Sequence, residues 1–164
     1  MQDYGFNPDF RDLLGALNEA DARYLIVGGY AFARYAKPRA TKDFDVWVDA
    51  SPDNGHRVWL ALAQFGTPGT HLAEEDLVSP GVTLQIGVEP NRIAIITQVS
   101  GLSFADAWPN RQAGDFGGIP TWYIGASDLL KNKLVAGRLQ DQADAQMLQQ
   151  FGYGPSPDHP PSKE

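Results

Sequence analysis

Two aspartates two positions apart are the residues of this chain best suited to carry chemistry. Asp43 and Asp45 lie in the segment 43–48 (DFDVWV), and an extended chain projects both carboxylates from one face. Two such charges side by side repel each other unless a cation lies between them, and Mg²⁺ prefers carboxylate oxygens. The alternative is a pair of solvent-facing acids on an amphipathic edge strand, and the pair alone does not decide between the two.

A glycine pair upstream favours the metal interpretation. Gly28 and Gly29 follow the apolar run 24–27 (YLIV), and thirteen residues separate them from Asp43. A backbone without side chains can approach a phosphate closely, and a helix that follows it offers its N-terminus to the anion. The glycines and the carboxylates together predict a site for a metal-bound nucleotide.

These residues need a scaffold of alternating helices and strands, and the apolar periodicity predicts one. Strands are expected at 23–27, 43–48, 82–86, 92–97 and 119–124. Helices are expected after Asn7-Pro8 and at 30–35, 51–65, 104–108, 127–136 and 141–148, with Ser127 and Asp141 as the N-caps of the last two. The segment 67–80 is expected to be loop with a short helical turn.

This order of elements predicts an α/β (α+β) fold, in which a small mixed sheet is flanked by helices. The 164 residues suit one domain, expected over residues 1–151 and followed by a disordered proline-rich tail at 152–164. The chain has no cysteine, so oxygen or histidine must hold any metal.

Charge and hydropathy limit the partners of the chain. No run approaches the ~18 apolar residues that a membrane span needs, and the first residues lack a signal-peptide pattern. We therefore expect a cytoplasmic protein that does not bind membranes. The net charge of −7 argues against binding of bulk duplex DNA but leaves room for an RNA end or a small acceptor.

The pattern VGG at 27–29 followed by DFDV at 43–46 resembles the signature of the DNA polymerase β-like nucleotidyltransferase superfamily. More closely, the chain resembles the small bacterial nucleotidyltransferases of the DUF6036 type, which are related to the AbiEii and MNT toxin-like groups. The stretches that carry this likeness are 24–31 (YLIVGGYA), 39–48 (RATKDFDVWV), 101–108 (GLSFADAW) and 131–144 (KNKLVAGRLQDQAD). The resemblance covers most of residues 10–150.

The resemblance implies a nucleotidyltransferase fold and a reaction. It implies Mg²⁺- or Mn²⁺-dependent transfer of a nucleoside monophosphate from an NTP to an acceptor hydroxyl on an RNA end, a protein or a small molecule. By the same analogy, a toxin–antitoxin or phage-defence role with an antitoxin partner is expected.

The resemblance also assigns roles to single residues. Gly28 and Gly29 approach the triphosphate, and Asp43 and Asp45 ligate the metal. Lys133 is expected to reach phosphate oxygens.

Other polar and charged residues lie near these positions. Thr41 and Lys42 precede the acids, and Arg39 lies just upstream. A basic loop here either steers polyphosphate or RNA toward the metal or balances the acids' charge, and both interpretations stay open. Arg138 and Asp141 are expected to form a structural ion pair, and Lys131 a solvated surface charge.

Enzymes of this superfamily use a third acid on a later strand. By the resemblance, the corresponding position in this chain is Ala94. The alternation of the 92–97 strand places Ala94 on the cleft side without a ligand to offer. Three explanations are open: catalysis is lost and nucleotide binding kept, Glu89 or another acid is recruited, or the alanine is an engineered substitution. The alternative function is therefore a catalytically inactive nucleotide-binding or partner-binding module of the same fold.

Overall fold

The computed structural model describes residues 6–38, 41, 43–66, 73–88 and 90–154. Helices and strands alternate over most of this length, as the sequence predicts. The elements are α1 (Pro8–Glu19), β1 (Tyr24–Val27), α2 (Gly28–Tyr35), β2 (Asp43–Val48), α3 (Pro52–Phe65), the 3₁₀ helix η1 (Glu74–Val78), β3 (Thr83–Ile86), β4 (Arg92–Ile96), α4 (Phe104–Ala107), the 3₁₀ helix η2 (Trp108–Asn110), β5 (Gln112–Phe116), β6 (Ile119–Tyr123), α5 (Ala126–Ala136) and α6 (Leu139–Gln150).

The strands form one mixed sheet in the order β3-β4-β2-β1-β6-β5. β2 runs parallel to β4 and β1 parallel to β6, whereas the pairs β1/β2, β3/β4 and β5/β6 are antiparallel. The predicted fold class, a mixed sheet flanked by helices, is confirmed. The strand that carries the two aspartates, β2, lies inside the sheet between β1 and β4.

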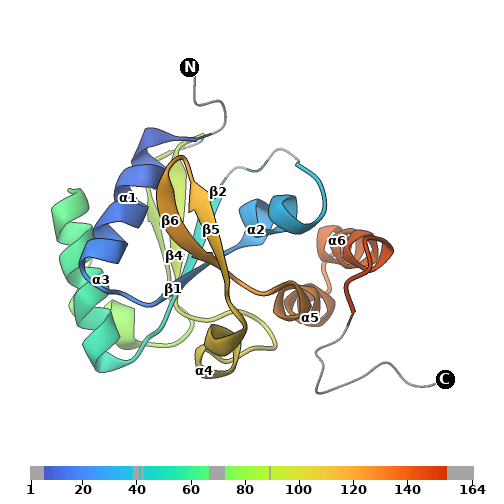
Figure 1. Cartoon of the computed structure of the whole chain (residues 1–164). Coiled ribbons are helices and arrows are strands. Elements are labelled where there is room, and N and C mark those ends of the chain that lie inside the picture. Colours follow the sequence, from blue (N-terminus) through green and yellow to red (C-terminus); the bar gives the residue numbers. More distant parts are fainter. Residues whose placement is uncertain (1–5, 39–40, 42, 67–72, 89, 155–164) are drawn as a thin grey trace.

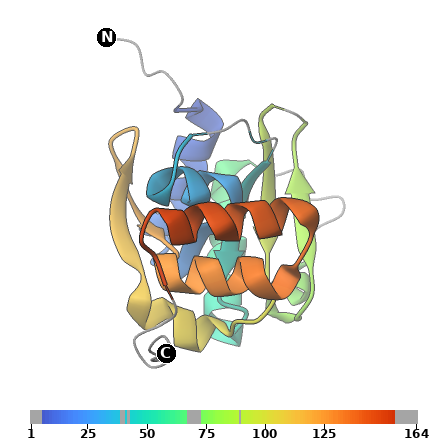
Figure 2. The same cartoon turned by 90° about the vertical axis from the view of Figure 1, so that its right-hand side faces the viewer.

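Helices cover both faces of the sheet. α1 and α3 pack on one face, and α2, α5 and α6 lie on the other (Figure 1). Figure 2 shows α5 and α6 side by side across that second face. Successive side chains of β2 point to opposite faces of the sheet. Phe44 points to the first face and stacks on Phe10 of α1, with ring centroids 4.5 Å apart. Asp43 and Asp45 therefore point toward the second face.

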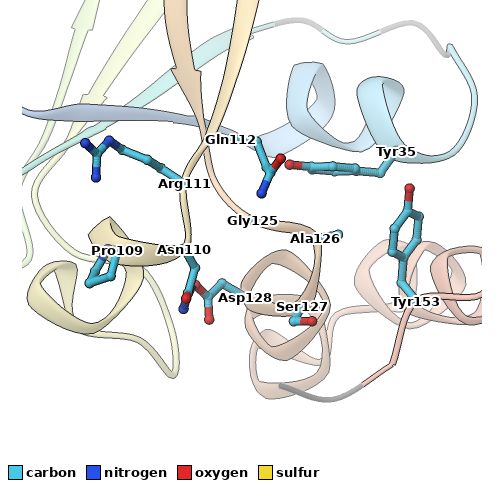
Figure 3. Close-up of a pocket in the computed structure, with 10 residues that line it drawn as sticks. All are labelled: Tyr35, Pro109, Asn110, Arg111, Gln112, Gly125, Ala126, Ser127, Asp128 and Tyr153. Atoms are coloured by element: carbon cyan, nitrogen blue, oxygen red, sulfur yellow. Dashed lines mark hydrogen bonds between the residues drawn. The ribbon is translucent and has the colours of Figure 1, made fainter. Parts of the chain in front are cut away.

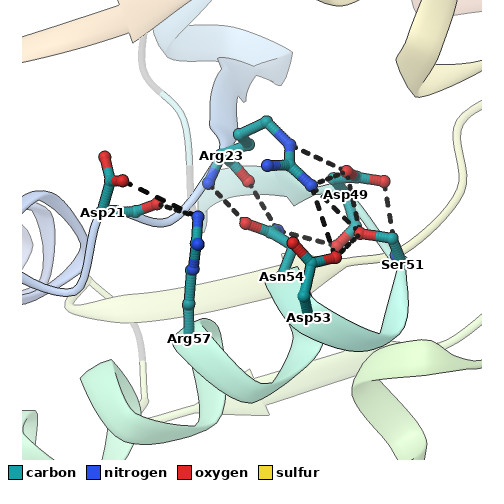
Figure 4. A network of polar contacts seen from close by, with 7 residues as sticks. All are labelled: Asp21, Arg23, Asp49, Ser51, Asp53, Asn54 and Arg57. Atoms are coloured by element: carbon teal, nitrogen blue, oxygen red, sulfur yellow. Dashed lines mark hydrogen bonds and ion pairs between the residues drawn. The ribbon is translucent and has the colours of Figure 1, made fainter.

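A polar network fixes the ends of β1 and β2 against α3 (Figure 4). Asn54, fully buried near the start of α3, accepts a hydrogen bond from the Arg23 backbone N–H at 2.7 Å and donates to the Asp49 carbonyl at 2.8 Å. The Arg23 guanidinium also pairs with the Asp49 carboxylate at 2.7 Å. Because Arg23 precedes β1 and Asp49 follows β2, these contacts hold the two strands in the register that positions the glycines and the acids.

The structure corrects the sequence prediction at one strand and three helix starts, the first of which is α2, which begins at Gly28 rather than Tyr30. β5 was not predicted, since its residues 112–116 (QAGDF) lack an apolar alternation; it is an edge strand that pairs with β6 alone. α5 has Gly125 rather than Ser127 at its N-cap. α6 has Arg138 at its N-cap, and the predicted cap Asp141 lies at the third helical position, where its carboxylate accepts the Arg138 backbone N–H at 3.2 Å.

The end of the chain is described as far as residue 154, so most of the predicted tail, 155–164, lies outside the described residues. Tyr153 packs edge-on against Tyr35 of α2, with ring centroids 5.5 Å apart. The chain therefore keeps contact with the α2 layer at that residue.

Candidate functional site

The glycine pair and the aspartate pair meet at the junction of β1, α2 and β2. Val27 pairs with Asp45 across the antiparallel ladder, and α2 begins at the next residue, Gly28. Gly28 has φ +68°, and a Cβ at this position would lie 3.0 Å from the Asp45 Cγ and closer still to a carboxylate oxygen. Only a glycine allows Asp45 to lie against the first turn of α2.

The second glycine lies against the segment that leads into β2. A Cβ at Gly29 would lie 2.7 Å from the Thr41 Oγ1, and this hydroxyl donates to the Asp43 carbonyl at 3.2 Å. Thr41 is thus in contact with the site, although its predicted role toward nucleotide stays a prediction. Sequence analysis also named residues that lie outside the described ones: Arg39, Lys42 and Glu89.

Strand β4 brings an arginine and an alanine to the same face as the acids. The parallel register pairs Arg92 with Asp43 and Ala94 with Asp45. The Arg92 Nε donates to the Asp43 Oδ1 at 2.7 Å, and both side chains are about one quarter exposed. Ala94, 3% exposed, occupies the position beside Asp45 where the resemblance leads one to expect a third carboxylate.

Asp45 titrates under opposing influences. Burial raises the pKa of its carboxyl to about 6, and the neighbouring negative charge of Asp43 contributes in the same direction. The cations of Lys133, Arg138 and Arg92 act against this rise. Three cations from β4, α5 and the α5–α6 turn therefore lie within electrostatic reach of Asp45.

Lys133 belongs to a buried ion cluster between α5 and α6. Its side chain is 7% exposed, and its Nζ lies 2.9 Å from an Asp144 oxygen and 3.5 Å from an Asp141 oxygen. The predicted Arg138–Asp141 ion pair is present at 2.6 Å, and Lys131 is exposed as expected. In this arrangement two acids hold the Lys133 ammonium, and its contact with phosphate stays a prediction.

The α6 acids are compensated by these cations. Burial would raise the pKa of Asp141, but the Arg138 guanidinium bonded to it and the nearby Lys133 ammonium outweigh burial and hold that pKa below its ordinary value. Asp141 is therefore an ionised partner of both cations in the neutral pH range.

The carboxylates fit one divalent cation better than two. Asp43 and Asp45 present hard oxygen donors on one face, and Mg²⁺ is often held by one or two carboxylates plus the oxygens of a substrate phosphate. Within the described ranges, no group of three or more Asp, Glu, His or Cys side chains that could hold a metal is present. The observed donors therefore suit a cation that arrives with a nucleotide, and Asp43 and Asp45 are the residues that would hold it.

A separate cavity of about 580 Å³ lies at the N-terminus of α5 (Figure 3). Tyr35 and Tyr153 border one side, and Asn110 and Asp128 lie on the other with the Asn110 amide donating to the Asp128 carboxylate at 3.1 Å. Burial raises the pKa of Asp128. None of the residues that line this cavity belongs to the predicted site.

Sequence reasoning missed Arg92 and Asp144 as neighbours of the predicted site residues. Arg92 lies two positions before Ala94, so its face was predictable, but its pairing with Asp43 depends on the register of strands 49 residues apart. Asp144 lies three positions after Asp141, a helical spacing that places both acids on one face of α6. That spacing was the available signal.

Across the part of the chain that the structure describes, no helix is long and apolar enough to cross a membrane. Comparison of the sequence with protein-family profiles finds no match. A search of curated proteins finds none either. The resemblance to nucleotidyltransferases therefore rests on the sequence stretches named above alone.

Proposed function

We propose that this chain binds an NTP with Mg²⁺ or Mn²⁺ and transfers its nucleoside monophosphate to an acceptor hydroxyl. The observation that carries this proposal is the contact between the Gly28 turn and the Asp45 carboxylate. The first turn of α2, which begins at Gly28, lies against Asp45, and Asp43 projects from the same face of β2. A helix N-terminus suits a phosphate and carboxylate oxygens suit Mg²⁺, so the two side by side support a site for a metal-bound triphosphate.

Each residue of the site has a part in this reaction. Asp43 and Asp45 would hold the cation, which supplies charge neutralisation at the phosphates. The backbone at Gly28 and Gly29 receives the phosphates, and Lys133 contributes positive potential from its buried position.

The bonding changes of the reaction balance without a further reactant. The acceptor oxygen bonds to the α-phosphorus while the bond from this phosphorus to the leaving oxygen breaks, and pyrophosphate departs. The acceptor proton leaves to water, because β4 offers Ala94 at the position of the expected acid. The acceptor is an RNA end, a protein side chain or a small molecule, and a role in toxin–antitoxin or defence systems follows by analogy.

Labelling with nucleotides tests the proposal directly. The chain is incubated with NTPs labelled at the α-phosphate, Mn²⁺, and total RNA or total protein. We expect label on an acceptor with α-labelled but not with γ-labelled NTP, and its loss in the Asp43→Asn and Asp45→Asn variants. A chain that neither labels an acceptor nor binds NTP contradicts the proposal.

Ala94 favours a second candidate, a nucleotide-binding module that has lost turnover. Restoring the acid with Ala94→Asp places a carboxylate beside Asp45 in the parallel register, and the matched control is Ala94→Asn. Labelling that appears only in the Asp variant identifies a disabled enzyme. Metal-dependent NTP binding without labelling in any of the three proteins identifies a binding module.

A further inference from the structure

The ion pair between Arg92 and Asp43 affects how a divalent metal binds at the site. The Arg92 guanidinium lies 2.7 Å from a carboxylate oxygen that the proposed metal would use. A divalent cation and a guanidinium on one partly buried carboxylate repel each other, and the low local dielectric strengthens this repulsion. Free metal therefore meets a site in which one of its two carboxylates is already neutralised.

The other two cations near Asp45 are held in a different way. Lys133 pairs with Asp144, and Arg138 pairs with Asp141, so acids of α6 compensate both. Arg92 pairs with Asp43, a carboxylate of β2 itself. Among these three described cations, Arg92 is the one whose ion pair must change if Asp43 binds a metal.

A polyphosphate provides the partner that makes this change favourable. Guanidinium groups bind phosphate oxygens through two parallel N–H donors, so Arg92 exchanges one charged partner for another when phosphate arrives with the cation. The metal then takes the place of Arg92 on Asp43, and the phosphate takes the place of Asp43 on Arg92.

We propose that Arg92 is an exchangeable counterion of Asp43 that makes the site select a metal–polyphosphate complex over the free metal. The inference rests on the proposed function, because it concerns the same carboxylates. It adds a residue that determines selectivity, and it predicts that metal and nucleotide bind as a unit.

Binding measurements on wild type and Arg92→Gln test this inference without an activity assay. Binding of Mn²⁺ alone is followed by electron paramagnetic resonance, and binding of Mn²⁺ with a non-hydrolysable ATP analogue by calorimetry. For Arg92→Gln we expect free Mn²⁺ to bind about tenfold more tightly and the Mn²⁺–nucleotide complex about tenfold more weakly, the scale of one charge-assisted contact. The control Arg57→Gln removes an arginine of α3 that pairs with Asp21 at 3.7 Å, and both affinities should stay at the wild-type level.

Arg92→Lys provides a second variant that keeps the cation. We expect its affinity for free Mn²⁺ to match wild type, whereas the Mn²⁺–nucleotide affinity falls about threefold because lysine lacks the bidentate fork. If Arg92→Gln does not fold, as judged by circular dichroism, this variant decides the question.

The outcomes separate the inference from the function on which it rests. Suppose that wild type binds the Mn²⁺–nucleotide complex but Arg92→Gln lowers the affinity for both ligands or for neither. Arg92 is then a structural residue, and the inference is wrong while the proposed function stands. If wild type binds neither ligand, the proposed function fails, and the inference fails with it.

Discussion

At the scale of single residues, Gly28 is constrained twice, by its positive φ and by the carboxylate that lies against it. An L-residue in the left-handed region costs about 1–2 kcal/mol, and at Gly28 the added Cβ must also displace Asp45. A substitution here therefore changes the stability of the fold and the position of a proposed metal ligand at once.

We predict that Gly28→Ala lowers the free energy of unfolding by more than Gly118→Ala does. Gly118 also has a positive φ, +95°, but a Cβ there meets no atom within 4 Å, so the control isolates the backbone cost. We expect a loss of about 1–2 kcal/mol for the control and of roughly 3 kcal/mol or more for Gly28→Ala, measured by urea unfolding. Equal losses would show that Asp45 moves aside without cost.

Asp45 gives a prediction for pH. Its pKa of about 6 in the folded chain exceeds the ordinary value near 3.9, so the folded state binds more protons than the unfolded state between these values. Stability from this group is present below about pH 4 and is lost as the pH rises through 6. At pH 8 in EDTA, we expect Asp45→Asn to have a free energy of unfolding higher than wild type by on the order of 1–2 kcal/mol, measured by urea unfolding. At pH 4, the two proteins should have similar free energies of unfolding.

The pH prediction compares the free energy of unfolding of Asp45→Asn with that of wild type at the same pH. A variant that is less stable than wild type at pH 8 would show that the ionised carboxylate stabilises the fold, contrary to the burial seen here. Asp49→Asn is an unsuitable control, because Asp49 anchors Arg23. The exposed Asp12→Asn, beyond the first turn of α1, changes one charge and serves to report general charge effects.

Residues placed by local spacing were predictable, and residues placed by long-range pairing were not. The period of two along β2 put Asp43 and Asp45 on one face, and the resemblance led us to expect Ala94 on the same side. The ion pair of Arg92 depends on the parallel register of β2 and β4, which no short-range signal specifies. The burial of Lys133 depends on the way α6 folds back on α5.

At the scale of elements, the α5–α6 hairpin is held by charges that are out of solvent. Lys133, Asp141 and Asp144 are all less than one tenth exposed, and their ion pairs cross the helix interface. Breaking a buried ion pair by removing one partner leaves a charge without compensation, which costs about 3–5 kcal/mol. The hairpin is therefore sensitive to its polar residues as well as its apolar ones.

Lys133→Met tests this sensitivity. The substitution keeps most of the side-chain volume and removes the charge, so we expect it to lower the free energy of unfolding by about 3–5 kcal/mol in urea. Lys131→Met, two positions away on the exposed side of the same helix, should change it by less than about 0.5 kcal/mol. A loss as small as the control's would mean that Asp141 and Asp144 find compensation elsewhere, from Arg138 first of all.

Elements with strong periodicity were predicted more accurately than the edge of the sheet. β2 follows its predicted bounds, and α1 and α3 begin where a proline follows Asn7 and Ser51, because both signals are local. β5 is defined by its pairing with β6, and its sequence QAGDF gives no alternation. Gly117-Gly118, at the turn between these strands, was the one local hairpin signal.

At the scale of the whole molecule, the residues of the proposed site come from different parts of the chain. β2 and β4 supply the acids and Arg92, α2 supplies the glycines, and α5 and α6 supply the buried cluster. These elements lie on the α2, α5 and α6 side of the sheet (Figure 1). A ligand that joins them stabilises contacts between segments that are distant in sequence.

Binding of a metal–nucleotide complex should therefore raise the melting temperature of the whole chain. A ligand at one hundred times its dissociation constant adds about 2.7 kcal/mol to the free energy of unfolding if it binds the folded state alone. For a chain of this length, that gain corresponds to a rise of roughly 5–10 °C in a thermal melt. We expect this rise with Mn²⁺ and a non-hydrolysable ATP analogue together, and a much smaller rise with either alone. The Asp43→Asn, Asp45→Asn double variant should show none of it, because the carboxylates that join cation and phosphate to the sheet are gone; an equal rise in this variant would place the nucleotide elsewhere on the molecule.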